Sequence, residues 1–355
     1  MNKKNIPLLI LSILIAVFMS EMILNLIKWE PSKKQDGYLQ FGYNTGIPLW
    51  DEDGILEEGM PVKIRLFQPD KDLFWRPVPN TSFTNSAGFR GKVEFSIEKR
   101  KNTKRIVILG DSCSFLGKKL YADFLKESLE KQDKVNEYEI INASVPGYTS
   151  YQGRKNLTSL LKYDPDYVCI YFGWNDHWTV PSGFSDKFHS SLESGLKFIN
   201  LIKLSIHKIK KEKNVRVPIA AYRKNISEIV AVLTERNITP ILITAPSGFQ
   251  KGKMPLWVFD FFKKFYHMND KEIMKIPETH ENYADVLIDI SKTKKVIIVD
   301  ALEVFKNPKD PWHKYFRNDL IHLKEKGHKL LADEILLKIK KYNDTINTNN
   351  SNNIL

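Results

Sequence analysis

Four short segments of this sequence carry side chains that together could transfer an acyl group through a serine ester. Ser112 would be the nucleophile and His322 the base, and Asp319, three residues before it, would orient the imidazole ring. Gly147 and the side-chain amide of Asn175 would supply N–H donors for the negative oxygen that forms during attack on an ester carbonyl. These residue types predict ester chemistry that needs no metal and no organic cofactor.

Each of these residues also has a purely structural explanation. Serine is a favoured N-cap at the start of a helix, so Ser112 could serve only there. Gly147 follows a proline and could form a plain turn, and Asn175 could hydrogen-bond its own backbone. His322 could be a surface histidine with Asp319 as a chance neighbour. The order and the context of the segments decide between the two explanations.

Several neighbouring residues are of types that could take part in chemistry, but we favour a structural role for each. Cys113 follows the candidate nucleophile, but a buried, small apolar residue is the simpler explanation. Asp176 and His177 follow Asn175 and are expected to have a local structural role. His328 is expected to mark the start of a helix.

Strand and helix patterns alternate from Arg105 onward, which predicts a parallel sheet covered by helices on both faces. The expected class is a three-layer α/β/α, flavodoxin-like fold with five parallel strands, at 105–109, 138–142, 167–172, 239–244 and 296–300. The expected helices lie near 121–132, 152–162, 218–236 and 325–341. Ligands bind at the carboxyl ends of such strands. Ser112, Gly147 and Asn175 follow the first three strands, and His322 precedes the last helix.

The quartet of Ser112, Gly147, Asn175 and His322, in this order and context, resembles the SGNH/GDSL hydrolases. The resemblance covers about 105–340. It implies a serine esterase with Ser112, Asp319 and His322 as the catalytic triad. It also implies an oxyanion hole formed by the N–H groups of Ser112 and Gly147 and the Asn175 amide.

Two upstream motifs resemble the lead-in of one bacterial subgroup of this family. They are Asp72-Leu-Phe-Trp-Arg-Pro-Val-Pro-Asn80 and Asn85-Ser-Ala-Gly-Phe-Arg-Gly91. Members of that subgroup are often membrane-anchored and occur with cell-surface polysaccharide systems. The resemblance implies an enzyme that removes O-acyl groups, O-acetyl among them, with cell-surface carbohydrate as one candidate substrate. An O-acyltransferase using the same site, and a catalytically silent polysaccharide-binding or assembly protein, are the alternatives.

The N-terminal segment combines Lys3 and Lys4 with an apolar stretch over 6–27, which is long enough to cross a bilayer. We expect an uncleaved anchor, with a cleaved signal and a buried helix as alternatives. Lysines follow the stretch too, so charge does not settle its orientation. The catalytic domain is expected outside the cytoplasm, secreted or periplasmic if the segment is cleaved. The expected divisions are 1–29 (anchor or signal), 30–104 (irregular lead-in), 105–342 (hydrolase domain) and 343–355 (disordered tail).

The chain has 54 Lys and Arg against 42 Asp and Glu, a net charge of +12. Half of this charge lies in 196–216, which has six Lys and one Arg against one Glu. Apolar residues at helical spacing alternate with those lysines, at Leu196, Ile199, Ile202, Ile206 and Ile209. The segment is expected to pack on the sheet, with a lid over the site and a helix on a membrane surface as alternatives. No nucleic-acid module is recognisable, so we expect no nucleic-acid partner; the oligomeric state is left open.

Some classes of protein are excluded by composition and motif. Hydrophobic residues make up 42% of the chain, which is too many for a disordered protein. Two cysteines cannot build a disulfide scaffold or a zinc site. The sequence has neither a phosphate-binding G-x-x-x-x-G-K-[ST] segment nor a G-x-G-x-x-G after the first strand, so a nucleotide enzyme is not expected.

Overall fold

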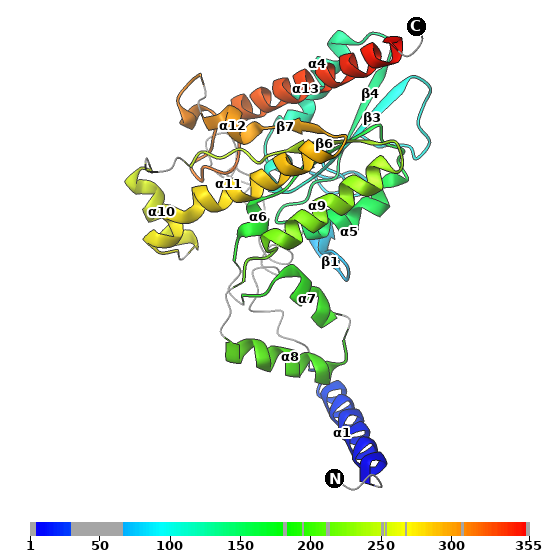
Figure 1. The fold of residues 1–355 in the computed structure, drawn as a ribbon, viewed down its shortest axis with the longest axis vertical. Helices are drawn as coiled ribbons and strands as arrows, with labels where there is room; N and C mark the ends of the chain where they lie inside the picture. The colour runs from blue at the N-terminus through cyan, green and yellow to red at the C-terminus, as the bar shows by residue number, and fades with distance from the viewer. Residues whose placement is uncertain are drawn as a thin grey trace.

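The computed structural model describes residues 5–29, 67–179, 183–193, 195–210, 214–249, 252, 254–266, 268–306 and 309–352. Its centre is a five-stranded sheet in the order β4-β3-β5-β6-β7, in which every neighbouring pair is parallel. The strands are β3 (Thr103–Gly110), β4 (Glu137–Asn142), β5 (Tyr167–Tyr171), β6 (Thr239–Ile243) and β7 (Ile297–Val299). This arrangement confirms the predicted fold class, and it places β4, the second of these strands along the chain, at one edge of the sheet (Figure 1).

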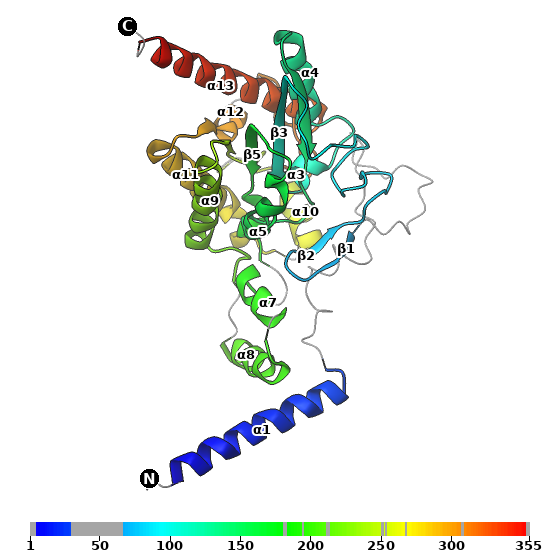
Figure 2. The same cartoon turned by 90° about the vertical axis from the view of Figure 1, so that its right-hand side faces the viewer.

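Helices cover both faces of the sheet because its strands are apolar on both sides. Along β3, Val107 and Leu109 face one hydrophobic cluster, and Ile106 and Ile108 face the other. The first face is covered mainly by α5 (Ser150–Leu161), α9 (Ile219–Thr234) and part of α11 (Asp270–Thr293). The second face is covered by α4 (Tyr121–Gln132) and α13 (Glu325–Asn352), with α10 (Leu256–Tyr266) and α12 (Ala301–Lys306) at its edge (Figure 2).

The last helix is longer than expected. A disordered tail was expected over 343–355, whereas in the structure α13 continues to Asn352. The physical reason is that no proline or glycine follows Gly327, so nothing stops a helix whose first turns are already packed. Tyr167 Oη donates to Asn343 Oδ1 at 3.2 Å, which ties the start of this extension to the sheet. Residues 353–355 lie outside the described part of the chain.

The described part of the lead-in region packs against the sheet domain. Residues 30–66 lie outside the described residues, and the remainder begins with an antiparallel hairpin of β1 (Phe67–Asp70) and β2 (Phe74–Pro77). Phe67 and Trp75 of this hairpin are buried in the same cluster as Val107. The hairpin therefore shares the core of the sheet.

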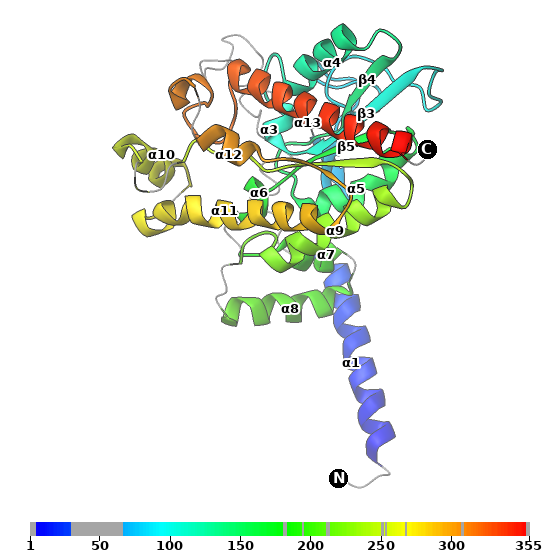
Figure 3. The same ribbon diagram turned by 45° about the horizontal axis from the view of Figure 1, so that its top comes forward.

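Three helices lie on one side of the sheet domain: α1 (Ile6–Leu26), α7 (Asp186–Glu193) and α8 (Lys197–Lys210). Among the described residues, α1 is the one helix long and apolar enough to cross a membrane. The α8 helix contacts α1 and α7 and lies away from the sheet (Figure 3). The expectation that this amphipathic segment packs on the sheet is therefore wrong.

Candidate active site

Ser112 lies where the chain turns from strand β3 into the short helix α3 (Ser112–Phe115). The preceding Asp111 is the N-cap of that helix, and its Oδ1 accepts the N–H of Cys113 at 2.8 Å. Asp111 is buried, whereas Ser112 stays partly exposed. The strand-to-helix turn thus presents the Ser112 hydroxyl at the carboxyl edge of the sheet.

His322 and Asp319 complete a chain of hydrogen bonds with Ser112. His322 Nε2 lies 2.9 Å from Ser112 Oγ, and His322 Nδ1 lies 2.6 Å from Asp319 Oδ2. The other carboxylate oxygen, Asp319 Oδ1, accepts the backbone N–H groups of Ile321 and His322 at 2.8 and 2.9 Å. Asp319 and His322 are three residues apart, and the local turn between them lets the Asp319 carboxylate contact both the backbone N–H groups and the imidazole ring.

The surroundings keep the Asp319 carboxylate ionised. Burial by itself would raise its pKa, but His322 and the two N–H groups of the turn outweigh burial and hold the pKa below its ordinary value. Asp111 differs, because burial dominates there and raises the pKa of Asp111 to about 6. Asp319 is thus the carboxylate suited to stabilise a positively charged imidazole.

Two backbone donors at this edge have no acceptor in the described part of the chain: the N–H groups of Ser112 and Gly147. Gly147 has φ of 80°, a conformation that favours glycine, and it follows β4 in a turn. The next N–H along, that of Tyr148, turns back to Val145 O at 3.0 Å. The turn therefore leaves the Gly147 N–H available to a bound oxygen.

Asn175 joins the Ser112 turn to the Gly147 turn. It lies in the short helix α6 (Trp174–His177), which follows β5 through Gly173 at φ of 147°. Its Nδ2 donates to Asp111 Oδ2 at 3.2 Å and to Tyr148 O at 3.0 Å. The amide nitrogen is thus held between the residue before Ser112 and the residue after Gly147.

Replacing Asn175 with alanine should lower kcat by about 10²–10³-fold, the usual effect of losing one donor to a developing oxyanion. Steady-state kinetics on a soluble ester measure this effect, and a thermal melt checks that the variant is folded. A fall in kcat of less than about threefold in a folded variant contradicts a role in the oxyanion hole.

Distant residues hold the Gly147 turn in place. Arg216 Nη1 donates to Gly147 O at 2.6 Å, and Trp75 Nε1 donates to Pro146 O at 3.1 Å. Arg216 is buried and forms an ion pair with Asp186 of α7, with 3.0 Å between Nε and Oδ1. In the sequence, Arg216 stands out only as one of the charges of a basic segment. No local pattern links it to Gly147, and Trp75 had a signal only as part of a lead-in motif.

Asp176 and His177 point into the protein interior. Asp176 is buried and accepts the N–H and the hydroxyl of Ser150, the first residue of α5, at 3.0 and 2.5 Å. His177 Nε2 lies 3.0 Å from Nδ1 of the buried His280. Burial raises the pKa of Asp176 to about 7, and it lowers the pKa of His177 well below its ordinary value. These contacts give both residues structural roles.

Replacing Asp176 with asparagine should stabilise the protein above neutral pH. The carboxyl has a pKa of about 7 when folded but about 3.9 when unfolded. Folding at about pH 8 therefore places a charge in an unfavourable site, whereas at about pH 4 the folded state keeps the group neutral. The free energy of unfolding of the variant should exceed that of the native protein by up to about 4 kcal/mol at the higher pH, and this difference should shrink as the pH falls. Denaturant unfolding across this range measures it, and a pH-independent difference contradicts it.

The thiol beside the nucleophile is unsuited to attack. Cys113 is 1% exposed, and burial raises the pKa of its thiol well above the ordinary value. The expectation that this residue is a small buried apolar group agrees with its position. His328 is likewise buried, at the start of α13, where burial lowers its pKa to about 3.

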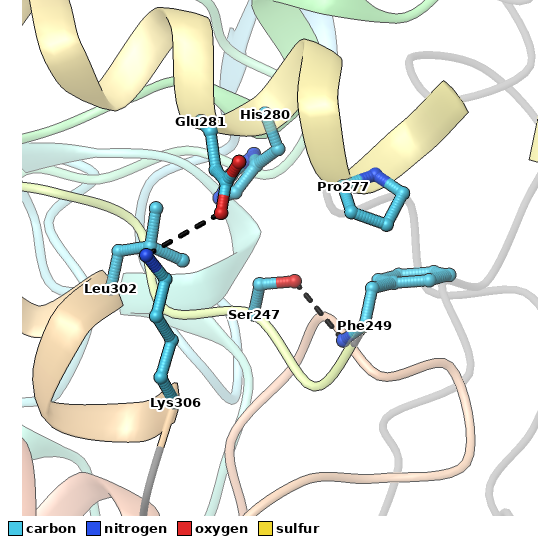
Figure 4. A pocket seen from close by; sticks show the side chains of 7 residues that line it. All are labelled: Ser247, Phe249, Pro277, His280, Glu281, Leu302 and Lys306. Atoms are coloured by element: carbon cyan, nitrogen blue, oxygen red, sulfur yellow. Dashed lines mark hydrogen bonds and ion pairs between the residues drawn. The ribbon is translucent and has the colours of Figure 1, made fainter. Parts of the chain in front are cut away.

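A cavity of about 260 Å³ lies at the same edge of the sheet, beyond β6. It is lined by Ser247, Phe249, Pro277, His280, Glu281, Leu302 and Lys306, with the Glu281–Lys306 ion pair on one side (Figure 4). Ser112, Asp319 and His322 do not line it. Its lining residue His280 stacks on Trp174, the neighbour of Asn175, with 3.9 Å between the ring centroids. No group of three or more potential metal ligands occurs among the residues that the structure describes.

Comparisons with known proteins place the chain in context. A family model described as the GDSL-like lipase/acylhydrolase family matches residues 108–330. One similar solved structure is a lipase/acylhydrolase from Enterococcus faecalis, at 19% identity and a TM-score of 0.46, covering 67% of this chain and 96% of that one. Another is an acetylxylan esterase from Geobacillus stearothermophilus, at 19% identity and a TM-score of 0.44, covering 66% and 94%. No curated protein matches the chain.

Proposed function

The chain belongs to the GDSL-like lipase/acylhydrolase family and is a serine esterase, and we propose that it cleaves O-acyl esters through an acyl intermediate on Ser112. The observation that carries this proposal is the chain of hydrogen bonds from Ser112 Oγ through His322 to Asp319, with lengths of 2.9 and 2.6 Å. A serine, an imidazole and a carboxylate so connected are the groups that activate a hydroxyl for attack on an ester.

In the first half of the reaction, Ser112 Oγ bonds to the ester carbonyl carbon while its proton passes to His322 Nε2. The tetrahedral intermediate then collapses, the bond to the leaving alcohol breaks, and His322 returns the proton to that alcohol. In the second half, water attacks the acyl-serine with His322 again as the base, which releases a carboxylic acid and restores Ser112. Asp319 stabilises the imidazolium that forms in each half.

The negative oxygen of each intermediate would bind to the N–H groups of Ser112 and Gly147 and to the Asn175 amide. The two backbone donors have no other acceptor in the described part of the chain, which supports this assignment. The Asn175 NH₂ group already donates both of its hydrogens, to Asp111 Oδ2 and Tyr148 O, so one of these bonds must be exchanged for a bond to the oxygen. The two backbone donors are held in advance, so they stabilise the transition state without a cost of reorganisation.

For the substrate we propose O-acyl groups, O-acetyl among them, with cell-surface carbohydrate as the carrier. The support for the carbohydrate is the resemblance of 72–80 and 85–91 to the lead-in of a polysaccharide-associated subgroup. Trp75, from the first of these motifs, donates to Pro146 O beside Gly147, so this motif is physically part of the site.

The intermediate can be tested with a series of p-nitrophenyl esters of increasing acyl length. We expect p-nitrophenyl acetate to be turned over, and a fluorophosphonate to label one residue, Ser112, with loss of activity. Peptide mapping after labelling locates the adduct. Labelling elsewhere with full loss of activity contradicts the assignment of Ser112, and turnover without covalent labelling contradicts the acyl-serine.

We also propose that α1 is an uncleaved anchor that places the catalytic domain outside the cytoplasm. The length of 21 residues and the apolar composition of α1 support a membrane span. If α1 is retained, the protein should stay in membranes washed with alkaline carbonate. Its intact mass should be that of a chain that begins at Met1 or Asn2. A mature protein that begins after α1 contradicts the anchor.

A further inference from the structure

The α8 helix presents an apolar face to the surroundings. Ile199, Ile202, Ile206 and Ile209 follow one another at spacings of three and four residues, so they share one side of the helix. These four side chains are between 38% and 79% exposed. A helix on the surface of a globular protein normally turns such a face toward the core. The exposed row therefore needs an apolar environment from outside the domain.

An adjacent side of α8, about a third of a turn from the isoleucine row, carries polar groups that face α7. Asn200 Nδ2 donates to Leu192 O at 2.7 Å, and Lys203 Nζ donates to Ser191 O at 3.0 Å. The ring of His207 lies 5.1 Å from that of Phe188. Because these contacts settle which side of α8 faces the domain, the exposure of the isoleucine row follows from the packing.

The N-terminus of α8 is joined to α1. Glu21 Oε2 accepts the backbone N–H of Phe198, in the first turn of α8, at 3.0 Å. A helix N-terminus favours a negative charge, so this contact offsets the cost of a carboxylate near the end of an apolar helix. The two helices meet near the C-terminal end of α1, and α1 extends from there away from the sheet domain, while α8 runs across that direction (Figures 1 and 3).

The charge of α8 indicates which kind of apolar environment the isoleucine row contacts. The helix contains four lysines and neither Asp nor Glu, so it is strongly basic. A second α8 helix would bring like charges together, whereas an anionic lipid surface would attract them. A basic helix with an apolar row lies in the interface of a bilayer, with the row among the acyl chains and the lysines among the headgroups.

We propose that α8 lies flat in the anionic membrane surface beside the point where α1 leaves the bilayer. This inference rests on the proposed anchoring by α1, because the position of α8 follows from its contact with that helix. The contacts of α8 with α7, and of Asp186 in α7 with Arg216, then connect the membrane surface to the turn that holds Gly147. The active site would thus have a fixed position relative to the lipid surface.

Variants of the full chain with one introduced cysteine can test the proposal in vesicles of equal parts phosphatidylcholine and phosphatidylglycerol. Cys113 and Cys169 are 1% and 0% exposed, so an environment-sensitive fluorophore attaches to the introduced thiol. We expect a label at Ile206→Cys to emit at shorter wavelength and several-fold more strongly than one at Leu337→Cys. Leu337 is the matched control, because it is an apolar residue of α13 with 55% exposure. Lipids carrying a nitroxide should quench the label at Ile206 but not the label at Leu337.

Two comparisons separate the inference from the anchor and from protein contact. A label at Ile15→Cys, within α1, reports the anchor: quenching at Ile15 but not at Ile206 overturns the position of α8 alone, whereas no quenching at Ile15 overturns the anchor. A shorter emission wavelength at Ile206 without lipid quenching indicates contact with protein and also overturns the proposal. With Lys208 and Lys210 replaced by glutamine, the Ile206 signal should depend less on the phosphatidylglycerol content of the vesicles. Each lysine removed should weaken the affinity of α8 for the anionic surface by roughly fivefold. Turnover of a soluble ester in detergent should be unchanged in all these variants, which shows that they are folded.

Discussion

Ser112→Ala should reduce esterase turnover by about 10⁴-fold or more, leaving only the residual acceleration that binding and the oxyanion hole provide. The variant removes the atom that bonds to the carbonyl carbon, and it leaves the backbone N–H of residue 112 in place. Ser112 is partly exposed, and His322 provides the hydrogen bond to its hydroxyl, so little stability should be lost. The binding site and most of the oxyanion hole therefore remain, and the loss isolates the contribution of the nucleophile.

Single-turnover and steady-state measurements with p-nitrophenyl acetate give this result directly. Ser114→Ala is a useful comparison, because Ser114 lies two residues away but is buried and contacts Tyr121 Oη at 2.9 Å. That variant should lose stability and keep most of its turnover per folded molecule. Equal turnover by the Ser112→Ala variant and the native protein would refute the assignment of the nucleophile.

Asp319→Asn should lower kcat by about 10³–10⁴-fold with a smaller effect on folding. The asparagine Oδ1 can still accept the N–H groups of Ile321 and His322, so the local turn is retained. Its NH₂ group would take the place of the carboxylate oxygen that now faces His322 Nδ1 at 2.6 Å. Two donors would then face each other, which favours the imidazole tautomer with the proton on Nε2 and removes the base beside Ser112.

The comparison variant is Asp319→Ala, which loses both the turn and the charge. It should lose stability that Asp319→Asn retains, whereas both should lose activity. Thermal melts and kcat on a soluble ester separate the two effects. If Asp319→Asn keeps kcat within about tenfold of the native value, Asp319 does not orient His322.

The strand and turn positions that carry the site could be recognised from local sequence. The run at 105–109 is apolar and β-branched and ends at Gly110, and the structure has a buried strand there that leads into Ser112. The pairing of Asp319 with His322 is equally local, because three residues of chain suffice to bring carboxylate and ring together. Such features depend on the nearest residues along the chain, so a single sequence contains the information for them.

The position at which α13 ends could not be predicted from local sequence. An Asn-rich composition suggested disorder after 342, yet the helix continues to Asn352. Composition measures the average tendency of a segment, whereas a helix already nucleated and packed by Leu331 and Ile335 extends at little cost per residue. The tertiary contact of Tyr167 with Asn343 acts in the same direction.

The sequence by itself determined the five strands, the order of the four site segments and the local turn at His322, since each follows from short-range pattern. Only the tertiary structure decided that Trp75 and Arg216 hold the turn at Gly147, from 71 and 69 residues away from their acceptors Pro146 and Gly147. It also decided that the isoleucine row of α8 faces outward and that Glu21 meets the N-terminus of that helix. Periodicity shows that a helix has an apolar side, but the direction of that side depends on partners brought close by folding.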